Sequence, residues 1–210
     1  MKECGADPLL LWRQQWAQLR TWLGSAGVLD HGDRPSVLAG WSVRDLVAHL
    51  GRGFITASMA SECDEAPLTI RQYVTGYAGA AGEIEADARV VATARGVDLL
   101  RWLDQVADDA FALIDGIKAP VVRGPRGPIT RHDFVVTRLL ELVVHGDDLA
   151  RSVPVGGSPL VDGAITVVAA ALADGYAEVA GRRPSSEHGI DWIRAATGRA
   201  PSDDPLLPLL

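Results

Sequence analysis

The stretch RLLELVVHGDDLA, residues 138–150, places an acid and an imidazole in a run made largely of leucine and valine. Glu141 and His145 are four residues apart, and residues at this spacing lie one above the other on the same face of an α-helix. Apolar residues flank that face on both sides. The pattern predicts a helix covered nearly all round, with Glu141, His145 and Asp148 pointing inward. A buried charge needs a partner.

Two explanations account for this acid and imidazole. They could bind one metal ion, or they could form a hydrogen bond between neighbouring turns that only stabilises the helix. From this helix alone, metal binding and a helix-stabilising hydrogen bond are equally well supported. A third ligand would favour the metal, and His49 in the stretch DLVAHL is the candidate, at the border between the apolar and polar faces of its own predicted helix. The remaining histidines are expected at the surface: His31, His132 and His188.

Length and composition are those of an ordinary globular protein. The chain has 210 residues, 48% hydrophobic and 22% charged, enough for one domain with or without a small appendage. Cys4 and Cys63 lie outside any C-x-x-C pattern, which argues against a disulfide framework and favours a reducing cytoplasm. No apolar run approaches about 20 residues, so no membrane association is expected. The net charge of −7 argues against nucleic acid as a partner.

The apolar residues recur mainly at helical spacing, and no strand is convincing. Between the helices, residues 118–130 contain three prolines and two glycines, which predicts a loop or a short irregular hairpin. Helices are expected at about 8–24, from Ser42 onward, at 69–116, 131–152 and 159–180, and as a short last one within 185–199. The second begins with Asp45 at the capping-box position, and Thr130 caps the helix at 131–152. The region 69–116 is expected as two segments, with breaks near Gly76–Gly82 and Gly96. The predicted fold class is all-α, a bundle over residues 1–153 with a short helical C-terminal extension over 154–210.

Two motifs together carry a family resemblance. GWSVRDLVAHLGR at 40–52 and RLLELVVHGDDLAR at 138–151 resemble the mycothiol-dependent maleylpyruvate isomerase family, part of the DinB-like superfamily of four-helix bundles. The family carries W-(S/T)-x-x-(D/E)-x-x-x-H on its second helix and E-x-x-x-H-x-x-D-L on its fourth. The end of the chain, from Trp192, is also similar to the family's C-terminus. The resemblance spans most of the chain and implies a DinB-like four-helix bundle.

This resemblance implies that His49, Glu141 and His145 bind a divalent metal, with zinc as the metal. Two imidazoles and one carboxylate with a fourth position open are a catalytic rather than a structural zinc arrangement. Asp45 and Asp148 are candidates to hold a ligand imidazole in its metal-binding tautomer. For Asp45 the alternative is simple capping of the helix N-terminus.

The resemblance also implies a reaction. Mycothiol, a thiol co-substrate, would add to the cis double bond of maleylpyruvate, the resulting single bond would rotate, and elimination would give fumarylpyruvate. Transfer of the same thiol to another small electrophile, such as a carboxylate, fits equally well, because the chain after residue 153 is shorter than expected of the named isomerase. Arg126 and Arg199 are the candidates for binding the thiol or an acidic substrate, with Arg123 and Arg131 nearby in sequence to the first. Each of these arginines could instead be a solvated surface residue.

Two further functions stay open at the level of sequence. One is a metal-dependent hydrolase with water as the nucleophile. The other is a metal-binding bundle without catalysis that acts as an interaction or regulatory module, with homodimerisation through apolar helix faces. The chain contains no nucleotide-binding glycine motif, no G-x-S-x-G and no H-E-x-x-H.

Overall fold

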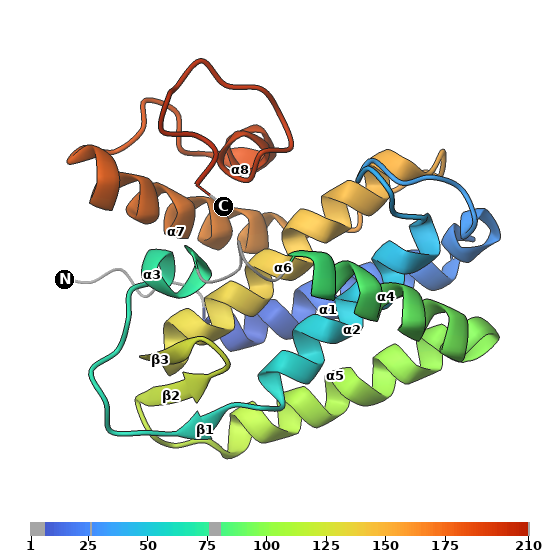
Figure 1. The fold of residues 1–210 in the computed structure, drawn as a ribbon, viewed down its shortest axis with the longest axis horizontal. Coiled ribbons are helices and arrows are strands. Elements are labelled where there is room, and N and C mark those ends of the chain that lie inside the picture. The colour runs from blue at the N-terminus through green and yellow to red at the C-terminus, as the bar shows by residue number, and fades with distance from the viewer. Residues whose placement is uncertain (1–6, 26, 76–80, 210) are drawn as a thin grey trace.

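The structure is a computed structural model, and it is described here for residues 7–25, 27–75 and 81–209 (Figure 1). These residues are mostly helical, as predicted. The α-helices are α1 (Pro8–Ser25), α2 (Val43–Ala57), α3 (Ile70–Thr75), α4 (Ala81–Arg95), α5 (Leu99–Gly116), α6 (Arg131–Ser152), α7 (Asp162–Ala180) and α8 (Gly189–Ala196). Two 3₁₀ turns join them, at Val28–His31 and Gly96–Asp98.

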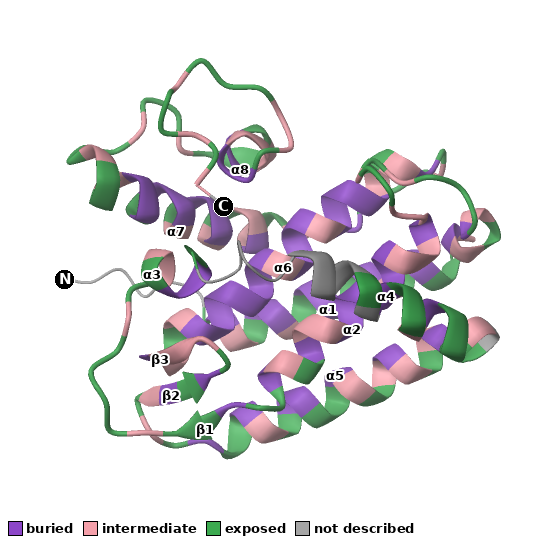
Figure 2. Ribbon diagram, in the orientation of Figure 1, coloured by how far each residue is buried: buried purple, intermediate pink, exposed green. Residues whose placement is uncertain are grey.

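Four of these helices, α1, α2, α5 and α6, form the bundle. α1 packs along α6, and α2 lies between α5 and α6 (Figure 1). α4 covers the outer side of α2. α6 is buried along nearly its whole length (Figure 2), which confirms the prediction that it is covered nearly all round. The fold class predicted from the sequence, an all-α DinB-like bundle, is therefore confirmed.

The start of α2 follows from its capping box. Ser42 Oγ accepts a hydrogen bond from the Asp45 backbone N–H at 3.1 Å, and Asp45 Oδ2 accepts one from the Ser42 backbone N–H at 3.0 Å. These bonds satisfy groups that the first turn of a helix leaves without partners. Further along, Gly51 lets α2 approach α5 closely, because a Cβ atom there would lie 2.2 Å from the Trp102 ring. The helix that carries His49 is thus held at its start and against α5.

The prediction that the chain contains no convincing strand is wrong. A small antiparallel sheet has the order β1 (Ser61–Glu62), β2 (Val121–Gly124) and β3 (Gly127–Thr130). β2 and β3 form a hairpin, one of the two structures predicted for residues 118–130. In its turn Gly127 has a φ of 119°, which a residue with a side chain rarely adopts. β1 has only two residues and finds its partner some sixty positions later. Such distant pairing leaves no local sequence signal.

The third predicted helical region contains three helices rather than two. The break at Gly96 is present and has a φ of 47°. The predicted break near Gly76–Gly82 lies in part outside the described residues. α3 ends at Thr75 before it, and α4 begins at Ala81. α3 was expected as part of a longer segment, but it is a separate short helix that contacts α6 and α7.

The C-terminal region packs back onto the bundle. α7 contacts α6 and α1, and α8 packs on α7 (Figure 1). The Gln15 side chain of α1 joins the two parts, since its amide donates to the Pro159 carbonyl at 2.7 Å and accepts from the Val161 N–H at 3.0 Å. By length and composition alone α7 could cross a membrane, but core helices of soluble proteins share these properties. The division into 1–153 and 154–210 stays a prediction.

Candidate metal centre

Three side chains converge between α2 and α6. His49 comes from α2, and Glu141 and His145 come from α6. Glu141 Oε2 lies 3.4 Å from His145 Nε2 and 3.7 Å from His49 Nε2. One ligand atom from each residue lies within 4.8 Å of the other two, and no fourth acid, histidine or cysteine of the described residues joins this group. The structure therefore brings together all three residues that the sequence predicts as metal ligands.

The separations suit a metal ion shared by these atoms. Ligand atoms about 2.0–2.1 Å from a tetrahedral zinc lie about 3.3 Å from one another. The two separations from Glu141, 3.4 and 3.7 Å, are close to this value and longer than a usual N–H···O hydrogen bond of about 2.9 Å. The side chains of His49, Glu141 and His145 are 10%, 20% and 12% exposed. The three side chains are therefore largely buried but not fully closed off from solvent.

Different neighbours orient the two imidazoles. The Trp41 ring meets the His49 ring edge to face with centroids 5.3 Å apart. His145 Nδ1 lies 3.1 Å from Asp148 Oδ2, so a carboxylate accepts its N–H and leaves Nε2 directed toward Glu141. Asp148 is thus placed for the orienting role predicted for it. Asp45 is not, because its carboxylate is used in the capping box with Ser42.

Burial and charge shift the acid–base behaviour of the three residues. Burial opposes the ionisation of Glu141, but the imidazoles of His145 and His49 outweigh it and hold the pKa of Glu141 well below its usual range. For His145, burial disfavours the charged form, but Asp148 and Glu141 together raise its pKa. The pKa of His49 is lowered, chiefly by burial and further by the neighbouring His145. Glu141 is therefore anionic and His49 neutral near pH 7, as metal ligands need to be.

Arg138 is a residue of the site that the sequence analysis missed. It lies one helical turn before Glu141 and is only 2% exposed. Its guanidinium lies 5.5 Å from the centre of the Phe134 ring, and its Nε donates to Thr137 Oγ1 at 3.2 Å. Its positive charge contributes to the low pKa of Glu141. The signal was available, because the helical period places Arg138 on the same face as Glu141 and His145.

The arginines predicted as binding residues lie in several places. Arg123 pairs with Glu65, and Arg131 donates to the Ile114 carbonyl at 2.9 Å, so both have structural contacts. Arg126 occupies the turn between β2 and β3. Arg199 does lie beside the site, with Nη2 3.5 Å from Asp148 Oδ2.

The remaining histidines lie away from the three converging residues. His132 and His188 are exposed, as predicted, and His31 is partly exposed. None of them belongs to the cluster of metal-ligand atoms.

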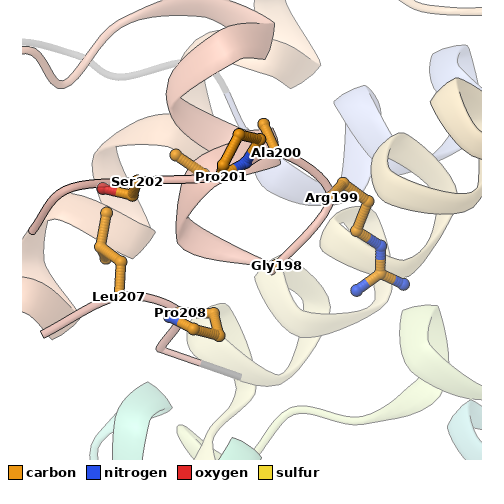
Figure 3. Close-up of a pocket in the computed structure, with 8 residues that line it drawn as sticks. Gly198, Arg199, Ala200, Pro201, Ser202, Leu207 and Pro208 are labelled. Carbon is orange, nitrogen blue, oxygen red and sulfur yellow. The ribbon is translucent and has the colours of Figure 1, made fainter. Parts of the chain in front are cut away.

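Arg199 also lies at the edge of an open cavity of about 480 Å³ formed by the C-terminal segment. Its other lining residues are Ala195, Gly198, Ala200, Pro201, Ser202, Leu207 and Pro208. In Figure 3 the Arg199 side chain extends away from Ser202 and Leu207. The guanidinium is thus directed toward Asp148 on α6 rather than into this cavity.

The described residues form a helix bundle of the DinB-like fold, with two imidazoles and a carboxylate gathered between two of its helices. Residues 12–150 match the family described as mycothiol maleylpyruvate isomerase N-terminal domain, and the chain belongs to this family. The family is that of an enzyme, as the sequence predicted.

A solved structure supports the same fold. The crystal structure of the mycothiol-dependent maleylpyruvate isomerase aligns with a TM-score of 0.55 and 18% identity, over 80% of this chain and 67% of that chain. At this identity the likeness shows a shared fold. No curated protein matches the chain in sequence.

Proposed function

We propose that this protein is a zinc-dependent enzyme that adds the thiol of mycothiol to a small electrophile, as an isomerase or an S-transferase. The observation that carries the proposal is the convergence of His49, Glu141 and His145 within a chain of the mycothiol maleylpyruvate isomerase family. Two neutral nitrogen ligands and one carboxylate leave a tetrahedral ion one position for an exogenous ligand.

The residues of the chain would hold the metal and control its charge. His49 and His145 would bind through Nε2 and Glu141 through Oε2, the atoms that face one another. A zinc ion in this place would supply a cation that keeps a thiol ionised near neutral pH. The only cysteine described, Cys63, is not part of the cluster, so the nucleophilic sulfur would come from the co-substrate. The reducing cytoplasm that the sequence favours would keep that thiol reduced.

The chemistry needs no net change of redox state. The thiolate forms a C–S bond to one carbon of an activated double bond, and the π electrons move toward the conjugated carbonyl. After rotation about the new single bond, these electrons re-form the double bond as the C–S bond breaks, which regenerates the thiolate and gives the trans isomer. If the adduct is instead protonated and released, the same addition is an S-transfer.

An acidic electrophile suits the charge around the site. Arg138 places a buried positive charge one turn from Glu141, and guanidinium groups bind carboxylates well. The positive charge of Arg138 repels a nearby metal ion, but it attracts an anionic substrate bound beside that ion. We therefore propose a substrate that carries a carboxylate, with maleylpyruvate as the first compound to test.

The test is turnover of maleylpyruvate by the purified zinc-loaded protein with and without mycothiol. We expect turnover that needs both zinc and mycothiol, is lost in Glu141→Gln, and is kept in His132→Ala, a control at an exposed histidine. Turnover of other electrophiles with mycothiol, but not of maleylpyruvate, would identify an S-transferase. Turnover without any thiol would contradict the proposal and indicate hydrolysis.

A further inference from the structure

Two neighbouring aspartates of α6 each contact an arginine of the C-terminal region. Arg194, on α8, donates to both oxygens of Asp147 at 2.7 and 2.9 Å. Arg199, just after α8, lies with Nη2 3.5 Å from Asp148 Oδ2. The two pairs differ in one respect, since only Asp148 contacts the ring of His145.

We propose that Arg199 is a positioning residue of the metal centre. It fixes the carboxylate of Asp148, which in turn holds His145 with its proton on Nδ1 and its Nε2 free to bind the metal. This inference rests on the proposed zinc site and assigns Arg199 a role different from the one predicted from sequence, which was to bind the thiol or the substrate.

Burial makes the orientation of Asp148 depend on its neighbours. Its side chain is 0% exposed, so water cannot solvate it. A buried carboxylate needs hydrogen-bond donors or a counter-charge, and Asp148 contacts His145 and Arg199. The same Oδ2 atom faces both. A guanidinium and an imidazole that both contact this oxygen limit the rotation of the carboxylate.

The local backbone directs Arg199 at α6. Gly198, with a φ of 73°, turns the chain after α8, and the Arg199 N–H donates to the Arg194 carbonyl at 2.7 Å. Arg199 Nη1 donates to the Thr197 carbonyl at 2.7 Å. The side chain is thus anchored by its own segment and extends away from the cavity (Figure 3). The C-terminal region thereby becomes part of the metal centre.

The experiment compares three full-length variants, Arg199→Gln, Arg199→Lys and Arg194→Gln. Zinc dissociation constants come from competition with a chromogenic chelator, and the tautomer of His145 comes from ¹⁵N NMR of the zinc-free protein at alkaline pH. We expect Arg199→Gln to weaken zinc binding by about 10- to 100-fold, the usual effect of removing a group that supports a ligand, and to mix the two tautomers. Arg199→Lys restores part of the affinity.

Arg194→Gln is the matched control, because it loosens the same region without contact to His145. It should lower the thermal stability while leaving the zinc affinity and the tautomer unchanged. Equal zinc affinity in Arg199→Gln and wild type overturns the inference, and so does an equal loss in Arg194→Gln and Arg199→Gln. Failure of the wild type to bind zinc overturns the proposed metal site itself, whereas tight zinc binding without thiol-dependent turnover overturns only the proposed reaction.

Discussion

At the scale of single residues, the two imidazoles of the centre differ because their neighbours differ. His145 faces two carboxylates, which raise its pKa, while His49 is buried beside Trp41 and has a lowered pKa. His49 is therefore ready to bind a cation, but His145 must first lose a proton. Protonation of His145 should control how tightly the centre binds zinc.

This predicts a pH dependence of metal binding. The raised pKa of His145 means that a proton competes with zinc at a pH where an ordinary histidine would already be neutral. The apparent affinity should rise with pH by up to about tenfold per unit below that pKa and level off above it. Zinc titrations between about pH 5.5 and 8.5 measure this. A flat profile across this range would contradict the assignment of His145 as a ligand.

The stability of the zinc-free protein should change with pH in the opposite direction to its zinc affinity. Because the folded pKa of His145 is raised, its interactions with Asp148 and Glu141 stabilise the zinc-free protein below the ordinary histidine pKa. This contribution is lost as the pH rises through the folded value. Zinc binding should therefore stabilise the fold most at neutral to alkaline pH, where the proton has left.

Arg138 gives a second prediction at this scale. Replacement of Arg138 by Gln should raise the KM for an acidic substrate by about tenfold or more, the loss of one charge-assisted contact. Zinc affinity should stay the same or increase, because a positive charge near the site is removed. Arg138→Lys keeps the charge and controls for packing. Steady-state kinetics with zinc titration separate these effects, and weaker zinc binding in Arg138→Gln would be the contrary result.

At the scale of elements, the site depends on how closely α2 packs. Gly51 faces Trp102 of α5, whereas Gly53 has only the Glu141 Cβ at 3.9 Å. A methyl group at position 51 would therefore clash with the Trp102 ring, whereas one at position 53 would lie at an ordinary contact distance from Glu141. The two glycines of one helix should respond differently to the same substitution.

The expected results are a loss of about 1–3 kcal/mol in the free energy of unfolding for Gly51→Ala, from overpacking, and a gain of up to about 1 kcal/mol for Gly53→Ala, from helix propensity. Urea unfolding of the zinc-free protein measures both. Equal stability of the two variants would show that α2 and α5 are not packed as closely as described.

The elements themselves were predictable to different degrees. Thr130 and the capping box at Ser42 mark helix starts by local hydrogen bonds, so α2 and α6 could be predicted from sequence. The spacing of Glu141 and His145 is likewise local. The pairing of β1 with β2 joins distant segments, and the contact of Arg199 with Asp148 depends on how α8 docks. No local pattern encodes either of them.

At the scale of the whole molecule, the C-terminal region packs against the bundle. α7 lies along α6 and α1, and Tyr176 donates to Asp204 at 2.6 Å, which ties the last residues to α7. Distant parts of the chain, α2, α6 and the segment after α8, thus meet at one place. His49 alone was ambiguous in the sequence, and its position beside Glu141 and His145 is what supports the proposal that it is a ligand rather than a half-buried core histidine.

The most direct test of this convergence is the absorption spectrum of the cobalt-substituted protein during titration with mycothiol. Cobalt occupies sites of the same ligand type and reports a bound thiolate by a new sulfur-to-metal charge-transfer band. We predict one equivalent of cobalt, a band that saturates at one equivalent of mycothiol, and neither in His49→Ala. Cobalt bound with full stoichiometry in His49→Ala, or a wild-type spectrum unaffected by mycothiol, would contradict the proposed centre.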